Sequence, residues 1–194
     1  MLDVPLATLA GRFDTLLLVD MVHLPEVRQR VRAYPHVHLL EGDVTGVISA
    51  LHGLGRSATP ADLAAVFALP PGLPGLPPVD WVASVNLFSQ LPLLPLAWAE
   101  RLCPALGESR LLAWQNGLLN GHLGWLGGLA PRGCLLADGR QEHLGPDGIL
   151  EVMDYSPWLE RLGVPDEQWS WQLAAGRELG RGARLEHLVQ AWDW

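Results

Sequence analysis

The 194-residue sequence contains no lysine, and all 13 of its basic residues are arginine. This absence excludes a Schiff-base lysine and a P-loop lysine within the chain, and with them two classes of enzyme. Cysteine is scarce as well, because only Cys103 and Cys134 occur and neither belongs to a CxxC pair. Two isolated cysteines without a secretory leader favour free thiols in a reducing, cytoplasmic compartment.

Long apolar runs and basic runs are also missing. Proline, glycine, asparagine or histidine interrupts each apolar stretch before it reaches the roughly 20 residues of a membrane span. The net charge is −8 and no basic run offsets it, so no surface for phosphates and no polybasic anchor is visible. The histidines show neither HxxxH nor HExxH spacing, which leaves no argument for a metal site. We therefore expect a soluble protein that binds neither nucleic acid, nor a membrane, nor a metal.

Apolar residues are abundant, at 49% of the chain against 18% charged residues. This composition is typical of a well-packed globular protein, and the length suits one domain over residues 1–194. The nine tryptophans, four of them between Trp169 and Trp194, predict aromatic packing in the core or at a dimer contact.

Strand and helix patterns alternate along the first half of the chain. The apolar run FDTLLLVD at residues 13–20 predicts a central parallel strand buried on both faces. A helix follows from Leu24 to near Pro35, then a strand at 37–40 and a helix at 44–54. This alternation predicts a parallel sheet with right-handed crossovers.

The second half begins with a Pro/Gly-rich surface loop or lid at residues 55–78, which contains a short helix. We then expect a strand from Val79 to near Asn86, helices at 96–106 and 108–129, and a strand at 133–137 that ends in a turn at Asp138 and Gly139. Two final strands, at 169–176 and 184–194, predict an antiparallel hairpin.

Two acids follow predicted strands. Asp20 ends the first strand, and Asp43 follows the second in the segment EGDVTG. Ligands of doubly wound sheets sit beyond the carboxyl ends of strands, where an acid can accept hydrogen bonds from ribose hydroxyls. The alternatives stay open, because Asp20 can cap the next helix or end its strand, and Asp43 can belong to a turn.

The segments LLLVDMVH and VHLLEGDVTGV resemble the second and third strands of class I S-adenosylmethionine-dependent methyltransferases. The segment DWVASVNLFSQLP resembles the fourth-strand motif of that family, and the final hairpin is similar to its antiparallel addition. The resemblance implies an α/β fold with a Rossmann-like, doubly wound, mostly parallel sheet and a C-terminal antiparallel hairpin. It also implies S-adenosylmethionine as cofactor, with Asp20 at the ribose and Asp43 at the adenine. Ser84, Asn86 and Leu87 would lie where the methyl donor meets its acceptor.

One part of the family pattern is missing. No GxGxG precedes Asp20, where the sequence is MLDVPLATLAG, so the first strand and its glycine-rich loop are not present. Those glycines let backbone N–H groups approach the cofactor. Either the true start lies upstream or the protein binds the cofactor weakly, if at all, and the upstream start is the more economical interpretation. A missing central strand would leave two exposed sheet edges, which would permit self-association as a homodimer.

Other polar residues have a functional and a structural interpretation. Asp138, Arg140, Glu142 and His143 follow a predicted strand and could supply a base or a substrate clamp, or form a solvated turn. His122 could be a base or a core histidine, and His23 would face the same cleft as Asp20.

Three functions remain in view. The first is methyl transfer from S-adenosylmethionine to a small-molecule acceptor that the sequence does not identify, with no catalytic residue assigned. The second is a non-catalytic, methyltransferase-like binding or scaffolding domain without a working cofactor pocket. The third is another Rossmann-like enzyme that uses a nucleotide, since an acid after the second strand also suits a dinucleotide ribose.

Overall fold

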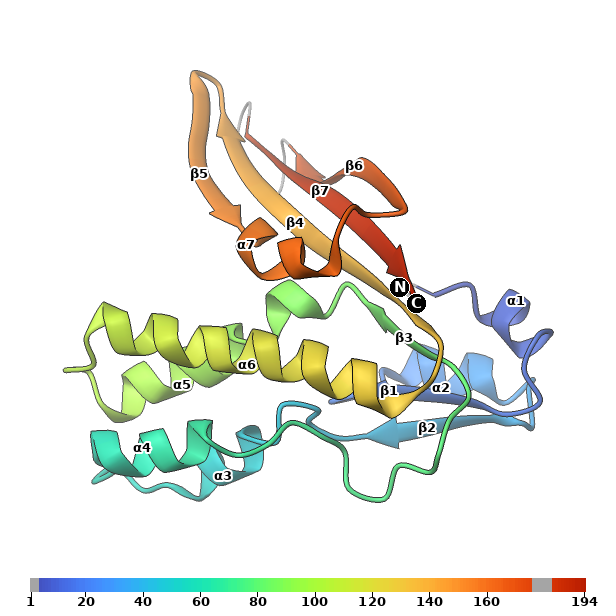
Figure 1. Cartoon of the computed structure of the whole chain (residues 1–194), viewed down its shortest axis with the longest axis horizontal. Helices are drawn as coiled ribbons and strands as arrows, with labels where there is room; N and C mark the ends of the chain where they lie inside the picture. The colour runs from blue at the N-terminus through green and yellow to red at the C-terminus, as the bar shows by residue number, and fades with distance from the viewer. Residues whose placement is uncertain (1–3, 176–182) are drawn as a thin grey trace.

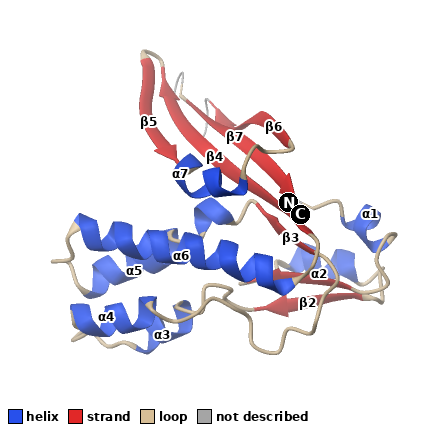
Figure 2. Ribbon diagram, in the orientation of Figure 1, coloured by secondary structure: helices blue, strands red, loops and turns tan. Residues whose placement is uncertain are grey.

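The computed structural model describes residues 4–175 and 183–194 and shows a mixed α/β fold (Figure 1, Figure 2). Its strands form two sheets, one of two strands and one of five. Helices pack beside both sheets, and none of the helices in the described part is long and apolar enough to cross a membrane. The predicted α/β class is confirmed, whereas the single continuous sheet is not formed by the described residues.

The smaller sheet contains the first predicted strand pair. It consists of β1 (Leu16–Asp20) and β2 (Val37–Glu41), which run parallel with Leu16 opposite Val37. The connecting helix α2 (Pro25–Val31) begins with proline, a residue that suits the first helical turn. Together with α1 (Leu6–Ala10) it encloses a small core. The predicted parallel strand–helix–strand unit is therefore confirmed.

Four helices pack together, and the first of them follows β2 in the chain. They are α3 (Ile48–Gly53), α4 (Pro60–Phe67), α5 (Leu93–Leu102) and α6 (Glu108–Leu129). Thr59 and Asp62 form a capping box at the start of α4, in which each side chain bonds the other residue's backbone. Leu51, Leu63 and Leu118 bring α3, α4 and α6 together in one core cluster. The predicted loop at 55–78 thus contains α4 and then an irregular segment.

The larger sheet has the strand order β3-β4-β7-β6, with β5 beside the distal part of β4. The strands are β3 (Val82–Val85), β4 (Gly133–Gly145), β5 (Gly148–Asp154), β6 (Glu167–Ala175) and β7 (Arg184–Asp193). β3 is parallel to β4, and the other pairs are antiparallel. The antiparallel pairing of the two final strands is therefore confirmed, while the residues predicted to form their turn lie outside the described part.

A second core lies between this sheet and α6. Phe88, Leu119, Leu135 and Trp192 are buried in it. Phe88 belongs to the 3-10 helix η1 (Phe88–Gln90), and Leu159 of the short helix α7 (Ser156–Leu159) joins the same cluster. The 3-10 helix η2 (Glu160–Leu162) follows α7 directly. Of the four C-terminal tryptophans, Trp192 is buried in this core, whereas Trp169, Trp171 and Trp194 are exposed, so the core interpretation is confirmed for Trp192 and is wrong for the other three.

One strand is longer than predicted, and another strand was not predicted. β4 does not end in a turn at Asp138, because the strand continues to Gly145 with a β-bulge between Asp138 and Arg140. The strand β5 was not predicted, and each of its residues is exposed. The long β4 gives β5 and β7 a common partner, which produces the part of the sheet that extends away from the helices in Figure 1.

The facing edges of the two sheets, at β1 and β3, carry no partner strand from the described residues. Leu16 and Asp20 bond β2 through N–H and C=O groups at 3.0 and 2.9 Å, so the peptide groups of Leu17 and Val19 point to the free edge. The same argument places Ala83 at the free edge of β3. Val19 is 37% exposed, so the prediction that this strand is buried on both faces was wrong.

Contacts at both ends of the strands connect the two sheets. Phe13, just before β1, stacks on Trp81, just before β3, with ring centroids 5.4 Å apart. Beyond β2, Val44 packs against the core of the larger sheet and its carbonyl accepts a hydrogen bond from the Gly72 N–H at 3.0 Å. These contacts hold the sheets together around the unpaired edges.

Candidate functional site

Asn86, at the carboxyl end of β3, has a backbone conformation that is unusual for its residue type. Its φ is +52°, the only positive φ among non-glycine residues of the described part. Asparagine tolerates this left-handed region better than most residues, but such positions cluster at functional sites. Its side-chain Oδ1 is buried and has no hydrogen-bond partner among the described residues. This predicted site residue thus has an acceptor oxygen that a ligand could use.

The other two predicted residues on this segment flank Asn86. Ser84 is buried, and its hydroxyl lies 3.0 Å from Nε2 of His122. Leu87 packs against the core of the larger sheet. The Gln90 side chain donates a hydrogen bond of 2.7 Å to the Asn86 carbonyl, which ties the segment to η1. The three residues are therefore held in place from both sides.

His122 connects this segment to α6 and is 2% exposed. Burial lowers the pKa of His122 to about 4, so the imidazole is neutral at physiological pH. Its second nitrogen, Nδ1, is buried without a partner among the described residues. The core interpretation of His122 fits this position.

Asp20 and Asp43 lie in the smaller sheet. Asp20 is the last residue of β1 and its side chain is exposed, while α2 begins only at Pro25, with Leu24 at its N-cap. Asp43 follows β2, and its carboxylate accepts hydrogen bonds from the Thr45 N–H at 2.8 Å and from the Ile48 N–H at 2.7 Å. Asp43 thus closes its own loop before α3, as the turn interpretation expected, although one acceptor position of the carboxylate remains.

The two groups of predicted residues occupy the strand ends on either side of the unpaired edges. Ser84, Asn86 and Leu87 end β3, whereas Asp20 and Asp43 end β1 and β2. No hydrogen bond among the described residues joins the two groups. His23 does not serve a cleft, because it is buried and its Nε2 lies 3.1 Å from the Leu40 carbonyl.

A buried polar cluster lies beyond the same end of β3, and its center is Asp138. One carboxylate oxygen accepts hydrogen bonds from Ser89 at 2.7 Å and from Gln141 at 2.9 Å, and the other lies 2.9 Å from Nδ1 of His187. Nε2 of His187 is buried and has no partner among the described residues. Asp138 is therefore neither a turn residue nor solvated.

The partners of Asp138 were not found from the sequence. The strand pattern at Leu185, His187 and Val189 places these residues on one face, and this period of two could have marked His187 as inward-facing. Ser89 gives no comparable signal. Of the other predicted residues near Asp138, Arg140 and Glu142 form an ion pair at 2.7 Å, and Nε2 of His143 is buried without a partner among the described residues.

Tyr155 is buried beside this cluster. Its hydroxyl donates a hydrogen bond of 3.4 Å to the Ser89 carbonyl. Burial and the nearby Asp138 carboxylate raise the pKa of Tyr155, so the phenol stays protonated at neutral pH. The region beyond β3 therefore combines a neutral imidazole, a buried carboxylate and a neutral phenol.

Comparisons of the chain with protein-family models, with curated protein sequences and with solved structures give no match.

Proposed function

We propose that the chain is a methyltransferase-like protein that uses S-adenosylmethionine, built on a Rossmann-like doubly wound sheet. The strand order supports this proposal. When β1 and β2 are taken as the second and third strands of the resemblance and β3 as the fourth, the unpaired edges of β1 and β3 stand where the missing central strand would lie. The antiparallel β6–β7 pair agrees with the family's C-terminal hairpin.

The observation that carries the proposal is the position of Asn86. In doubly wound sheets, ligands bind beyond the carboxyl ends of strands near the point where the strand order reverses. Asn86 lies at the carboxyl end of β3, with a positive φ and an amide oxygen that has no partner among the described residues, and this position supports the proposal. Strained, unsatisfied groups of this kind are frequent where a ligand completes the hydrogen bonding.

The residues of the chain fit the proposed cofactor in part. The exposed Asp20 carboxylate can accept hydrogen bonds from ribose hydroxyls, and Asn86 can accept one from the amino-acid part of the cofactor or from the acceptor. Bound S-adenosylmethionine supplies an electrophilic methyl group, and the chain's contribution is to align the acceptor with it. Asp43 contributes less, because its own loop uses most of its acceptor positions.

Calorimetric titration of the chain with S-adenosylhomocysteine tests the cofactor assignment. We expect micromolar binding, about −8 kcal/mol, and a loss of at least tenfold in affinity for Asp20→Ala. Asp14→Ala is the matched control, since Asp14 is also exposed but precedes the same strand. Equal affinities for Asp20→Ala and the unchanged protein would contradict the ribose assignment.

A second candidate function is a non-catalytic binding domain of the same fold. The engagement of Asp43 by its own loop favours this candidate, because the predicted adenine contact is largely satisfied without ligand. A folded chain that gives no heat with S-adenosylhomocysteine would support it. The same titration after fusion of a strand and glycine-rich loop to the N-terminus would then show whether those elements restore binding.

A further inference from the structure

The turn that leads from β3 into η1 is held by hydrogen bonds from several side chains. The Ser84 hydroxyl lies 3.0 Å from Nε2 of His122, and the Ser89 hydroxyl donates a hydrogen bond of 2.7 Å to Asp138. All four of these side chains are buried. The side chain of Gln90 also bonds this turn, but Gln90 is exposed on η1. Gln90 can therefore be changed without disturbing the core.

The backbone of Asn86 is bonded on both sides of its Cα atom. Its N–H donates a hydrogen bond of 2.9 Å to the Leu136 carbonyl of β4. Its carbonyl accepts a hydrogen bond of 2.7 Å from the Gln90 side chain, and the described residues supply no other donor to this carbonyl. The first bond orients the peptide group before Cα, and the second orients the peptide group after it. Together they fix the conformation of the residue.

This conformation also determines where the Asn86 side chain points. Because β4 holds the N–H, a change of φ would move the Cβ atom and the carbonyl of Asn86 together. A bond that holds the carbonyl at the φ of +52° therefore holds the side chain as well. The buried Oδ1, which has no partner among the described residues, is kept in place by a bond that it does not itself make.

We infer that Gln90 is a positioning residue for Asn86, whose left-handed backbone it holds so that Oδ1 stays where the proposed function places the ligand. The contact between Oδ1 and a ligand rests on the proposed function, whereas the hold of Gln90 on the backbone does not. An exposed hydrogen bond contributes modestly to stability. Loss of the Gln90 amide should therefore weaken ligand binding and leave the chain folded.

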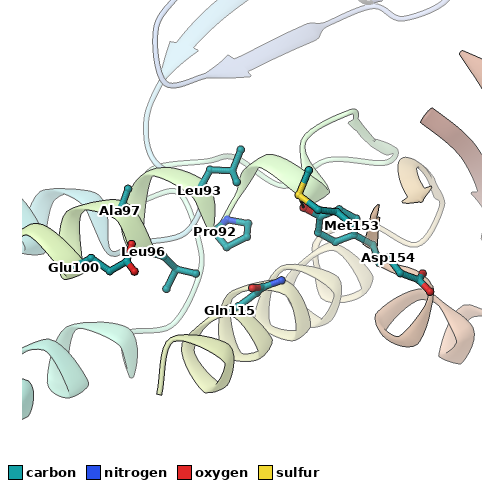
Figure 3. A pocket seen from close by; sticks show the side chains of 9 residues that line it. Pro92, Leu93, Leu96, Ala97, Glu100, Gln115, Met153 and Asp154 are labelled. Carbon is teal, nitrogen blue, oxygen red and sulfur yellow. Dashed lines mark hydrogen bonds between the residues drawn. The ribbon is translucent and has the colours of Figure 1, made fainter. Parts of the chain in front are cut away.

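A second glutamine provides the matched control. Figure 3 shows Gln115 on α6 at a cavity of about 320 Å³, which also borders the beginning of α5. The lining of this cavity includes neither Asn86 nor Gln90. Gln115→Ala thus removes the same amide group at a place that does not contact Asn86. A ligand that binds in the cavity, and not at Asn86, would respond to Gln115→Ala.

Nuclear magnetic resonance tests the backbone hold without any ligand. The N–H and Hα hydrogens of one residue are closest when φ is positive, so the nuclear Overhauser effect between them in Asn86 reports its left-handed conformation. This signal should be strong in the unchanged protein and in Gln115→Ala, and clearly weaker in Gln90→Ala. A folded Gln90→Ala variant with the full signal would overturn the inference.

Calorimetric titration with S-adenosylhomocysteine tests the connection to the ligand. Gln90→Ala should weaken binding about fivefold, which is the effect of one exposed hydrogen bond, while Gln115→Ala should leave the affinity unchanged. In an Asn86→Gly background Gln90→Ala should cause no further loss, because glycine has no Oδ1 to position and adopts a positive φ without help. Circular dichroism confirms the folding of each variant.

Three outcomes of the titration would contradict the positioning role. They are an unchanged affinity in Gln90→Ala, the same fivefold loss in the Asn86→Gly background, and an equal loss in Gln115→Ala. A folded, unchanged protein that gives no heat would instead contradict the proposed function. The Overhauser comparison would then still decide whether Gln90 holds the backbone of Asn86.

Discussion

The two sheets differ in how well their strands are paired and how much of their surface other elements cover. Among the described residues, β1 of the smaller sheet (LLLVD) and β3 at the edge of the larger sheet (VASV) are each paired with a neighbour on one side only. β4 and β7, by contrast, are paired on both sides and lie against α6 and α7. Among the described residues, the core of the smaller sheet is formed with α1 and α2.

This difference indicates where the stability of the protein resides. Strands with many buried apolar neighbours open only with the whole fold, whereas edge strands with exposed peptide groups open locally. The larger sheet contains the buried side chains Leu135 and Val189, and Phe88 of η1 is fully buried against it, while Val19 in β1 is exposed. We therefore expect the larger sheet and α6 to form the stable part of the molecule.

The largest effect that separates the two regions should come from their core residues. Phe88→Ala removes a fully buried ring from the larger core and should lower the free energy of unfolding by about 4 kcal/mol. Val37→Ala in the smaller core removes much less apolar volume and should cost about 2 kcal/mol. Urea unfolding followed by circular dichroism measures both. Equal costs would show that the smaller sheet is as tightly packed as the larger one.

The sequence predicted the local units of both regions well. The alternation of apolar runs and amphipathic helices identified the parallel β1–β2 pair, and the turn-rich C-terminus identified the β6–β7 pair. These features depend on neighbouring residues in the chain, so composition and periodicity suffice to find them.

The environment of a strand was harder to predict. The apolar run at residues 13–20 reads as a buried central strand, but its exposure depends on whether another strand lies beside it, which a local pattern does not contain. β4 was cut short because Asp138 and Gly139 are typical turn residues, whereas Gly139 here forms a β-bulge. β5 was missed because its partner residues belong to that unrecognised extension.

The candidate site shows the same limit. Asp20, Asp43 and Asn86 were predicted as site residues because they follow recognisable strands. The hydrogen bonds of Asp138 to Ser89 and His187 were not, because each pair is separated by 49 residues and is brought together only by the register of β4 and β7 and the position of η1. Long-range pairing of this kind requires the three-dimensional structure.

The next largest effect is expected when the free energy of unfolding is measured as a function of pH. It should come from His122 on α6, in the part of the molecule that we expect to be stable. His122 has a pKa of about 4 in the folded protein, against about 6.5 in an unfolded chain. As the pH falls, the unfolded chain binds this proton first, so the stability contributed by neutral His122 is present above pH 6.5 and is lost progressively toward pH 4. Between pH 7.5 and pH 4.5 the loss should be about 2.5 kcal/mol.

The measurement compares urea unfolding of the unchanged protein and of His122→Gln at both pH values. Glutamine can still bond the Ser84 hydroxyl but does not titrate, so the variant should lack the His122 part of the acid destabilisation. A stability difference between the two proteins that is the same at pH 7.5 and pH 4.5 would show that His122 is not the titrating group.

The smallest effect is expected at the free edge of β1, where it tests whether that edge is open. Val19→Thr replaces a methyl group by a hydroxyl at a position that is 37% exposed, and it should change the free energy of unfolding by less than about 0.5 kcal/mol. The same substitution at Val189, which is fully buried in β7, places a hydroxyl in an apolar core and should cost about 2 kcal/mol. Thermal or urea unfolding at several protein concentrations measures both variants. If Val19→Thr costs as much as Val189→Thr, and more at high concentration, then the β1 edge is covered in solution by a second copy of the chain, and the contrast between the two sheets holds only for the isolated molecule.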